Sequence, residues 1–114
     1  MRPKDLSKRI IKILSEKKAE DILLIDVRRV LSPYVSYFVV ASATSETHSR
    51  ALTNEIKKSL KKKEIMVLHI EGYQYGHWVL MDYIDVVVHI FLPEERKYYA
   101  LEDLWGDMPT YRFE

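Results

Sequence analysis

Two aspartates, Asp82 and Asp85, are the residues of this chain best placed in the sequence to support metal-dependent chemistry. Magnesium-dependent phosphoryl or nucleotidyl transfer needs carboxylates that converge on the metal, commonly two from one strand at positions i and i+2. No two acidic residues of this sequence are two apart. Asp82 and Asp85 are three apart, so a continuous strand would place them on opposite faces, although a turn could reunite them. The acidic residues therefore argue against catalysis without closing the question.

Phosphate-binding loops and histidine metal sites have characteristic spacings, and the sequence contains none of them. The three glycines, at positions 72, 76 and 106, form neither G-x-x-x-x-G-K-[ST] nor G-x-G-x-x-G. His48, His69, His77 and His89 match no paired-ligand spacing, and there is no cysteine to supply a thiolate. His89 lies in the most apolar segment, where we expect a hydrogen-bonded core histidine. We therefore expect no metal and no cofactor.

Hydroxyl side chains cluster around His48, and one of them could be imagined as a nucleophile. These hydroxyls belong to Ser42, Thr44, Ser45, Thr47 and Ser49. A helix start requires such side chains as caps, and no G-x-S-x-G motif accompanies them. Helix capping is the interpretation we favour.

Aromatic residues gather in and after a glycine-containing loop: Tyr73, Tyr75, Trp78 and Tyr83. Aromatic anchors of this kind carry much of the energy of protein interfaces. In an alternating strand, Trp78, Leu80 and Asp82 share one face, while Val79, Met81 and Tyr83 share the other. One face would then pack on the core while the other meets a partner. The alternative is that Trp78 is a core residue, since buried tryptophan is common.

Hydrophobic periodicity predicts the elements that position these residues. We expect a helix over about 5–18 with Asp5 as N-cap, a second helix after Thr44 and Ser45, and a third from Pro93 to Trp105. Strands are expected at 22–27, 37–41, 66–70, 78–81 and 86–92, the last two forming a hairpin. This order predicts one α/β domain over residues 1–114, with a mixed five-stranded sheet flanked by helices.

Composition fits a small globular protein. The chain has 114 residues, 47% of them hydrophobic, and a net charge of +1. Its apolar stretches are far shorter than the roughly 20 residues that cross a bilayer. Met1 to Asp5 resembles neither a signal peptide nor a presequence. We expect a cytoplasmic protein without a membrane partner.

The segment Trp78-Val-Leu-Met-Asp82-Tyr-Ile-Asp85-Val-Val-Val-His89-Ile-Phe91 resembles the signature of the Iojap, or ribosomal silencing factor, family. Further matches are spread over about residues 5–109: Asp21 to Val27, Tyr37 to Ala41 with Thr44, Ser45 and His48, Glu71-Gly72, and Tyr98 to Asp107. Three departures put local turn geometry in question. Ser36 replaces a usual aspartate, Ser42-Ala43 a threonine-glycine, and Ile84 a turn glycine.

The resemblance implies a nucleotidyltransferase-like fold without catalytic residues. It also implies binding to the large ribosomal subunit through its ribosomal protein number fourteen, at a surface that would otherwise bridge to the small subunit. Joining would be blocked sterically, without allostery, and translation lowered. By match of position, the resemblance assigns the contact first to Trp78, Asp82 and Tyr83, and then to Leu80, Glu71 and Asp85.

Other interpretations remain open beside this one. A residual nucleotidyltransferase is suggested by fold analogy and by Asp82 and Asp85, a role in ribosome assembly is an alternative function, and the aromatic surface could serve a homodimer. Five lysines cluster at the end of the second predicted helix: Lys57, Lys58, Lys61, Lys62 and Lys63. Charge runs are most often a solvated helix end, and the alternative is a contact with ribosomal RNA.

Overall fold

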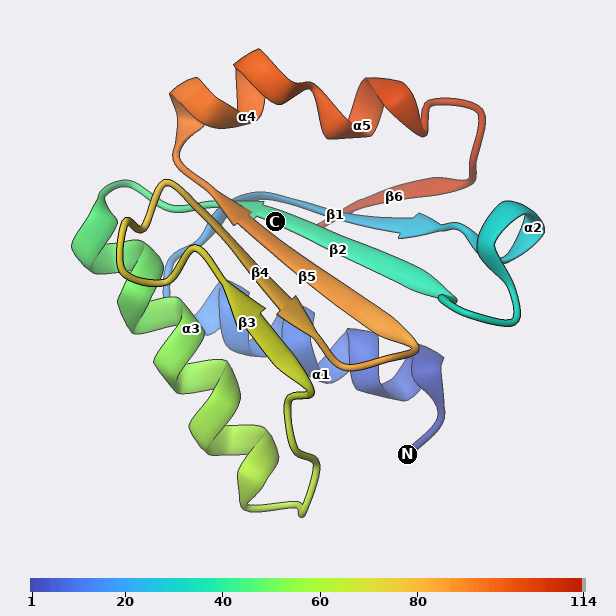
Figure 1. Cartoon of the computed structure of the whole chain (residues 1–114), viewed down its shortest axis with the longest axis horizontal. Helices are drawn as coiled ribbons and strands as arrows, with labels where there is room; N and C mark the ends of the chain where they lie inside the picture. Colours follow the sequence, from blue (N-terminus) through green and yellow to red (C-terminus); the bar gives the residue numbers. More distant parts are fainter. Residues whose placement is uncertain (114) are drawn as a thin grey trace.

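Six strands form one mixed sheet in the order β3-β4-β5-β2-β1-β6 in the computed structural model, which describes residues 1–113 (Figure 1). They are β1 (Glu20–Asp26), β2 (Tyr37–Ser42), β3 (His69–Glu71), β4 (Trp78–Asp82), β5 (Val86–Phe91) and β6 (Thr110–Phe113). β2 and β5 are parallel, and the other neighbours are antiparallel. The predicted mixed α/β sheet is confirmed, but its predicted count of five strands is wrong. β6 was missed because this edge strand is largely exposed and only four residues long, so its polar–apolar alternation is too short to stand out.

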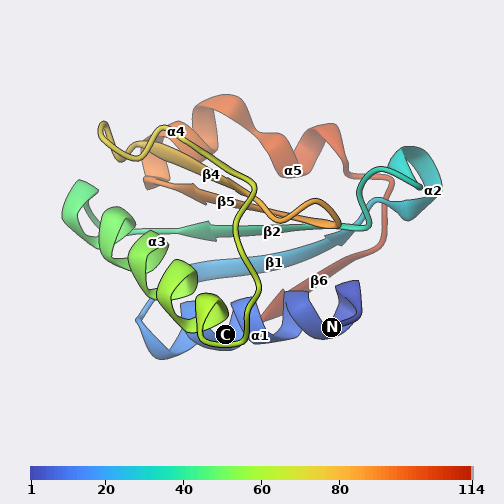
Figure 2. The ribbon, with the colours of Figure 1, turned by 60° about the horizontal axis from the view of Figure 1, so that its bottom comes forward.

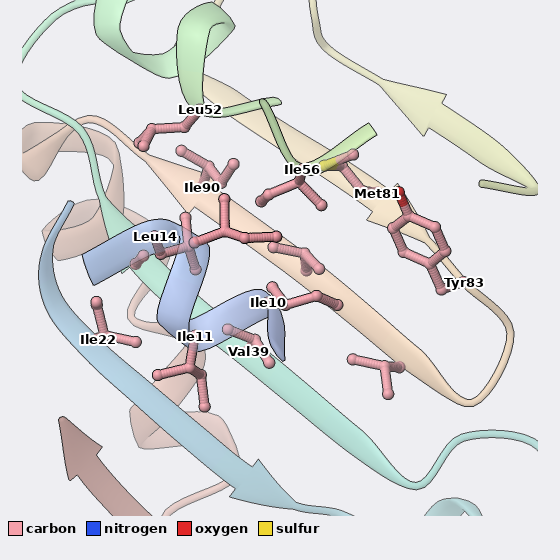
Figure 3. Close-up of a cluster of buried hydrophobic side chains, with 14 of the residues drawn as sticks. Ile10, Ile11, Leu14, Ile22, Val39, Leu52, Ile56, Met81, Tyr83 and Ile90 are labelled. Atoms are coloured by element: carbon pink, nitrogen blue, oxygen red, sulfur yellow. The ribbon is translucent and has the colours of Figure 1, made fainter. Parts of the chain in front are cut away.

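Two amphipathic helices, α1 (Pro3–Glu16) and α3 (Glu46–Lys61), cover one face of the sheet (Figure 2). Leu6, Ile10 and Leu14 of α1 and Leu52, Ile56 and Leu60 of α3 point into the main core. Figure 3 shows members of both sets meeting Val39, Met81 and Ile90 of the sheet. This core contains most of the buried apolar residues and holds the two helices together as one layer.

The opposite face carries two short helices, α4 (Pro93–Tyr99) and α5 (Leu101–Leu104) (Figure 2). Sequence periodicity predicted one continuous helix here. The chain instead breaks at Ala100, whose backbone is left-handed with φ 47° and ψ 45°. The break lets Leu101 and Trp105 pack on a second core that includes Phe38, Val87 and Phe91.

Helix starts and strand ends differ in detail from the prediction. Asp5 is not the N-cap of α1, because the helix begins earlier, with Pro3 in its first turn and Arg2 at the cap. Ser45 does cap α3, since its side chain accepts a hydrogen bond from the backbone N–H of His48 at 3.0 Å. β3 is shorter than the predicted 66–70 strand, and α2 (Arg28–Leu31) is an unpredicted single turn.

Candidate binding face

Strands β3 and β4 present a surface that α4 and α5 leave partly open to solvent. Trp78, Leu80 and Asp82 point to this side of β4 and are only partly buried, whereas Val79 and Met81 are fully buried beneath. The register places Glu71 opposite Leu80 and His69 opposite Asp82, and both β3 residues are exposed. We call these five residues (His69, Glu71, Trp78, Leu80 and Asp82) the β4 face. The predicted alternation of β4 is thus confirmed.

Trp78 is held from three directions. Its ring stacks on Phe91 and packs against Tyr99, each with ring centroids 4.8 Å apart. Its indole Nε1 donates a hydrogen bond to Nδ1 of His89 at 3.2 Å. Trp78 packs on the second core, as the core interpretation predicted, and it still exposes part of its ring, so its contact with a partner stays a prediction. A side chain fixed in this way loses little further entropy on meeting a partner.

Gly72 allows the loop before Trp78 to pass close to the backbone of β4. Its φ is +78°, and a Cβ placed on it would lie 2.1 Å from the carbonyl oxygen of Trp78. The backbone N–H of Gly76 closes the loop by donating to the carbonyl of Gly72 at 2.9 Å. A side chain at position 72 would push β4 away, so glycine is required here.

Tyr83 does not share the face of Trp78. It is 6% exposed and lies in the main core with Met81, under α3 (Figure 3). Burial raises the pKa of its phenol to about 12, and its hydroxyl has no hydrogen-bond partner among residues 1–113. Strand alternation explains this, because position 83 follows Met81 on the inward side. The structure therefore separates Tyr83 from the other contact residues assigned by resemblance.

Asp82 and Asp85 flank the turn of the β4–β5 hairpin. The Oδ1 of Asp82 accepts a hydrogen bond from the backbone N–H of Ile84 at 2.7 Å. Ile84 occupies the left-handed region with φ 74°, the conformation that a glycine would adopt without strain. Asp85 is exposed, and its backbone carbonyl accepts from the N–H groups of Ser36 and Tyr37. Across residues 1–113, no three His, Asp or Glu side chains form a group that could hold a metal.

His89 lies directly beneath the β4 face, opposite Leu80 in the register. It is 5% exposed, and the loss of solvent lowers its pKa to about 4, so the ring is neutral at pH 7. Its Nδ1 accepts from Trp78, and its ring packs edge-on against Phe38 at 5.1 Å between centroids. The predicted hydrogen-bonded core histidine is confirmed.

His77 joins three elements at the edge of this face. Its Nδ1 lies 2.8 Å from a carboxylate oxygen of Glu95 in α4, and its Nε2 lies 2.8 Å from one of Glu46 in α3. Both contacts are hydrogen bonds only when both ring nitrogens carry protons. The hydrogen bonds that the protonated ring donates to Glu46 and Glu95 accordingly raise the pKa of His77. When both ring nitrogens are protonated, His77 ties both helices to the start of β4.

Three residues around the face were not identified from sequence: His69, His77 and Tyr99. His69 faces Asp82 only through the strand register, and Tyr99 reaches Trp78 because the chain breaks at Ala100. His77 gains its partners from residues 31 and 18 positions away. The adjacency of His77 to Trp78 was the one local signal available.

The lysines predicted as a possible RNA contact lie on and after the last turns of α3. Lys57, Lys58, Lys61 and Lys62 line a surface hollow of about 470 Å³ together with Asn54. Lys63 follows the helix and is exposed. The cluster is separate from the β4 face, because α3 packs on the other side of the sheet (Figure 2).

Comparison with known proteins places this architecture in one family. The family model described as "Ribosomal silencing factor during starvation" matches residues 1–114. The chain is 36% identical to "Ribosomal silencing factor RsfS" of Halalkalibacterium halodurans, over all of this chain and 97% of that protein. It is 42% identical to the protein of the same name from Bacillus subtilis, over 90% of this chain and 89% of that protein.

Solved structures agree with the sequence relatives. A crystal structure of a Chromobacterium violaceum protein superposes with a TM-score of 0.89 at 37% identity, covering 93% of this chain and 88% of that one. A Bacillus halodurans structure gives a TM-score of 0.84 at 33% identity, covering 96% and 99%. The sheet, the signature segment from Trp78 to Phe91 and these matches agree. The chain therefore belongs to the ribosomal silencing factor family, which also includes the Iojap proteins.

Proposed function

We propose that this protein binds the large ribosomal subunit through its ribosomal protein number fourteen and sterically prevents the small subunit from joining. The β4 face is the proposed contact, with Trp78 and Leu80 at its centre and Asp82 and Glu71 beside them. Asp85 at the adjacent turn is a further candidate. A bound particle that overlaps the position of the small subunit excludes it without any conformational change, and translation falls as a result.

The observation that carries this proposal is the composition of the β4 face. An immobilised tryptophan next to a partly exposed leucine provides the apolar centre that interface hot spots require. Glu71 and Asp82 add negative charge at its margin, which favours a basic partner surface. Tyr83 is left out of the contact because it is buried on the other side of the strand.

We also propose that the protein acts by binding and not as an enzyme, in the cytoplasm, where it would meet ribosomes. The oxygen Oδ1 of Asp82 is occupied by the backbone of the hairpin turn. This use gives Asp82 a structural role that needs no metal. A nucleotidyltransferase-like fold without catalytic residues stays part of this proposal. No helix in residues 1–113 is long and apolar enough to span a membrane.

Co-sedimentation with purified large subunits tests the contact. We expect the protein to travel with large subunits on a sucrose gradient, and Trp78→Ala and Leu80→Arg to release it, with losses of about 2 kcal/mol or more for an anchor residue. Tyr111→Ala is the matched control, because Tyr111 is an exposed aromatic residue on the distant strand β6. Circular dichroism would verify that each variant is folded. If both variants still travelled with the large subunits, the β4 face would not be the contact.

Subunit joining tests the mechanism. Light scattering of mixed subunits should show slower and less complete association when the protein is added to the large subunit first. Leu80→Arg should restore joining. Unchanged rate and extent at saturating protein would show that exclusion of the small subunit is not what this protein does.

A role in ribosome assembly is a second candidate function, favoured by one relative. The chain is 34% identical over 99 residues to the mouse protein named "Mitochondrial assembly of ribosomal large subunit protein 1", of which it spans 43%. Depletion of the present protein would then leave immature large subunits. Normal subunit maturation after depletion would remove this candidate.

The free protein is also proposed to pair with itself through the same surface. Tyr98, Tyr99 and Leu104 are exposed apolar residues of the α4–α5 segment, and Tyr99 adjoins Trp78. Covering such an apolar patch lowers the free energy of the protein in water, which favours pairing. Light scattering at increasing concentration would show a dimer that Leu80→Arg weakens, and a monomer throughout the range would contradict pairing.

A further inference from the structure

Charge is divided unequally between the parts of this nearly neutral chain. Residues 1–18, which contain α1, hold seven Lys and Arg against two acidic residues. Residues 46–64, which contain α3, hold six against three. The rest of the chain has five basic and twelve acidic residues, so a net charge of +8 in the two helical segments is nearly cancelled by −7 elsewhere. The overall value of +1 hides this separation.

Both basic segments lie on the same side of the molecule. α1 and α3 pack beside each other on the face of the sheet opposite α4 and α5 (Figure 2). We call their solvent-facing side the helical layer. In α1, Lys4, Lys8 and Lys12 recur every four residues and are all exposed. In α3, Lys57 and Lys58 are followed one turn later by Lys61 and Lys62. Residues four apart on a helix are about 6 Å apart along its axis, so each helix carries a row of closely spaced cations.

The lysines of the helical layer have no ionic partners among the residues that the structure describes. Within residues 1–113, the ion pairs made by Arg or His involve Arg28, His69, His77, Arg96 and Arg112, and no lysine takes part. Arg50 of α3 donates to the carbonyl of Gln74, which uses no negative charge. Most of the positive charge is therefore available to a partner.

Neither helix exposes a large apolar side chain, and this limits the classes of partner that the helical layer fits. Every large hydrophobic residue that is exposed in residues 1–113 lies outside α1 and α3. Helices that bind membrane surfaces insert large apolar residues, and protein interfaces have an apolar centre. Rows of lysine without either feature suit a phosphate backbone, which lysine contacts as a point charge.

We infer that the helical layer is a second binding surface, which holds an RNA backbone without reading its sequence. The β4 face and the helical layer lie on opposite sides of the sheet and carry opposite charge. One protein could then hold a ribosomal protein on one side and an RNA strand on the other. The inference rests on the proposed function for its choice of ribosomal RNA as the polyanion, but its test needs no ribosome.

Fluorescence anisotropy with the whole protein and a short labelled RNA duplex tests the inference. We expect binding at low salt that weakens steeply as salt is added, because neutralised phosphates release counterions. Replacing Lys4, Lys8 and Lys12 with Gln should weaken binding on the order of tenfold and reduce the salt slope by roughly 2 to 3. The same replacement of Lys57, Lys58 and Lys61 should have a similar effect.

Arg29, Lys97 and Arg112 provide the matched control, because they are exposed and lie outside the helical layer. Changing all three to Gln removes the same charge and should leave RNA binding within about twofold, since non-contacting charges act only through a screened field. Equal losses in the control and layer variants would overturn the inference. No RNA binding by the native protein, or binding to anionic lipid vesicles in place of RNA, would also overturn it.

Measuring binding to large subunits and to free RNA in parallel distinguishes this inference from the proposed function. Subunit binding without binding to free RNA would leave the proposed function standing and remove the RNA surface. Binding to RNA without binding to subunits would do the reverse.

Discussion

The indole of Trp78 is the hydrogen-bond donor to His89, joining β4 to β5 directly beneath the candidate binding face. Because Nδ1 of His89 accepts, the neutral ring must carry its proton on Nε2. That atom is buried and has no partner in the part of the chain that the structure describes. Of the two ring nitrogens of His89, Nδ1 is therefore the one that is paired within residues 1–113, and its partner, Trp78, forms the centre of the face.

Trp78→Phe should destabilise the protein even though an aromatic ring remains. Phenylalanine can still stack on Phe91, but Nδ1 of His89 would be left buried and unpaired, at a cost of about 1–2 kcal/mol. Urea unfolding would measure the loss. Trp105→Phe is the control, since Trp105 packs edge-on against Phe38 and loses no hydrogen bond in residues 1–113. Equal losses for the two variants would show that the hydrogen bond contributes nothing.

His89 should make the protein less stable in acid. Its pKa is about 4 in the folded chain against 6.5 for an ordinary histidine, so between these values the unfolded chain binds the additional proton. Titration of His89 leaves stability essentially unchanged above pH 6.5 and lowers it by about 3 kcal/mol as pH drops to 4. His89→Gln keeps an acceptor for Trp78 and does not titrate. Its unfolding free energy should fall less over this range, and parallel curves for the two proteins would contradict the assignment.

His77 should have the opposite pH dependence. Its hydrogen bonds to Glu46 and Glu95 raise its pKa above 6.5, so its contribution is complete below that pH and is lost as pH rises through the folded value. NMR titration of the ring should give a raised pKa that decreases in Glu46→Gln and again in Glu95→Gln. Glu55→Gln is the control, because this α3 residue bonds Ser59 and does not contact the ring. An ordinary pKa in the native protein would exclude the charged bridge.

The sequence predicted those parts of the fold that depend on local pattern. The apolar stripe of Leu52, Ile56 and Leu60 located α3, Ser45 located its start, and the alternation of Trp78 to Asp82 separated the two faces of β4. These features were predictable because one residue's environment is set by neighbours three or four positions away. β6 and the break at Ala100 depend on pairing and packing with distant elements. A four-residue alternation was the local signal for β6, and no local pattern marked the break at Ala100.

For the candidate site, too, the sequence predicted what depends on local spacing and not what depends on distant elements. Trp78, Leu80 and Asp82 could be grouped from their spacing alone. Glu71 and Tyr83 were both assigned with them by resemblance. The strand register places Glu71 opposite Leu80 on the same face, whereas Tyr83 follows Met81 in the alternation and points inward. The charge separation was hidden by the overall sum, and it became visible once α1 and α3 were known to lie side by side.

Tyr83→Phe distinguishes a buried position from a contact position. The hydroxyl of Tyr83 is buried without a hydrogen-bond partner in residues 1–113, so removing it should leave stability unchanged or raise it by up to about 1 kcal/mol. Because the side chain points into the core under α3, the variant should also bind large subunits as tightly as the native protein. Leu80→Arg, on the outer side of the same strand, should retain its fold and lose binding. Urea unfolding and sucrose-gradient co-sedimentation of the two variants would measure both quantities. Loss of subunit binding by a stably folded Tyr83→Phe would mean that the hydroxyl reaches the partner, which requires β4 to open on binding.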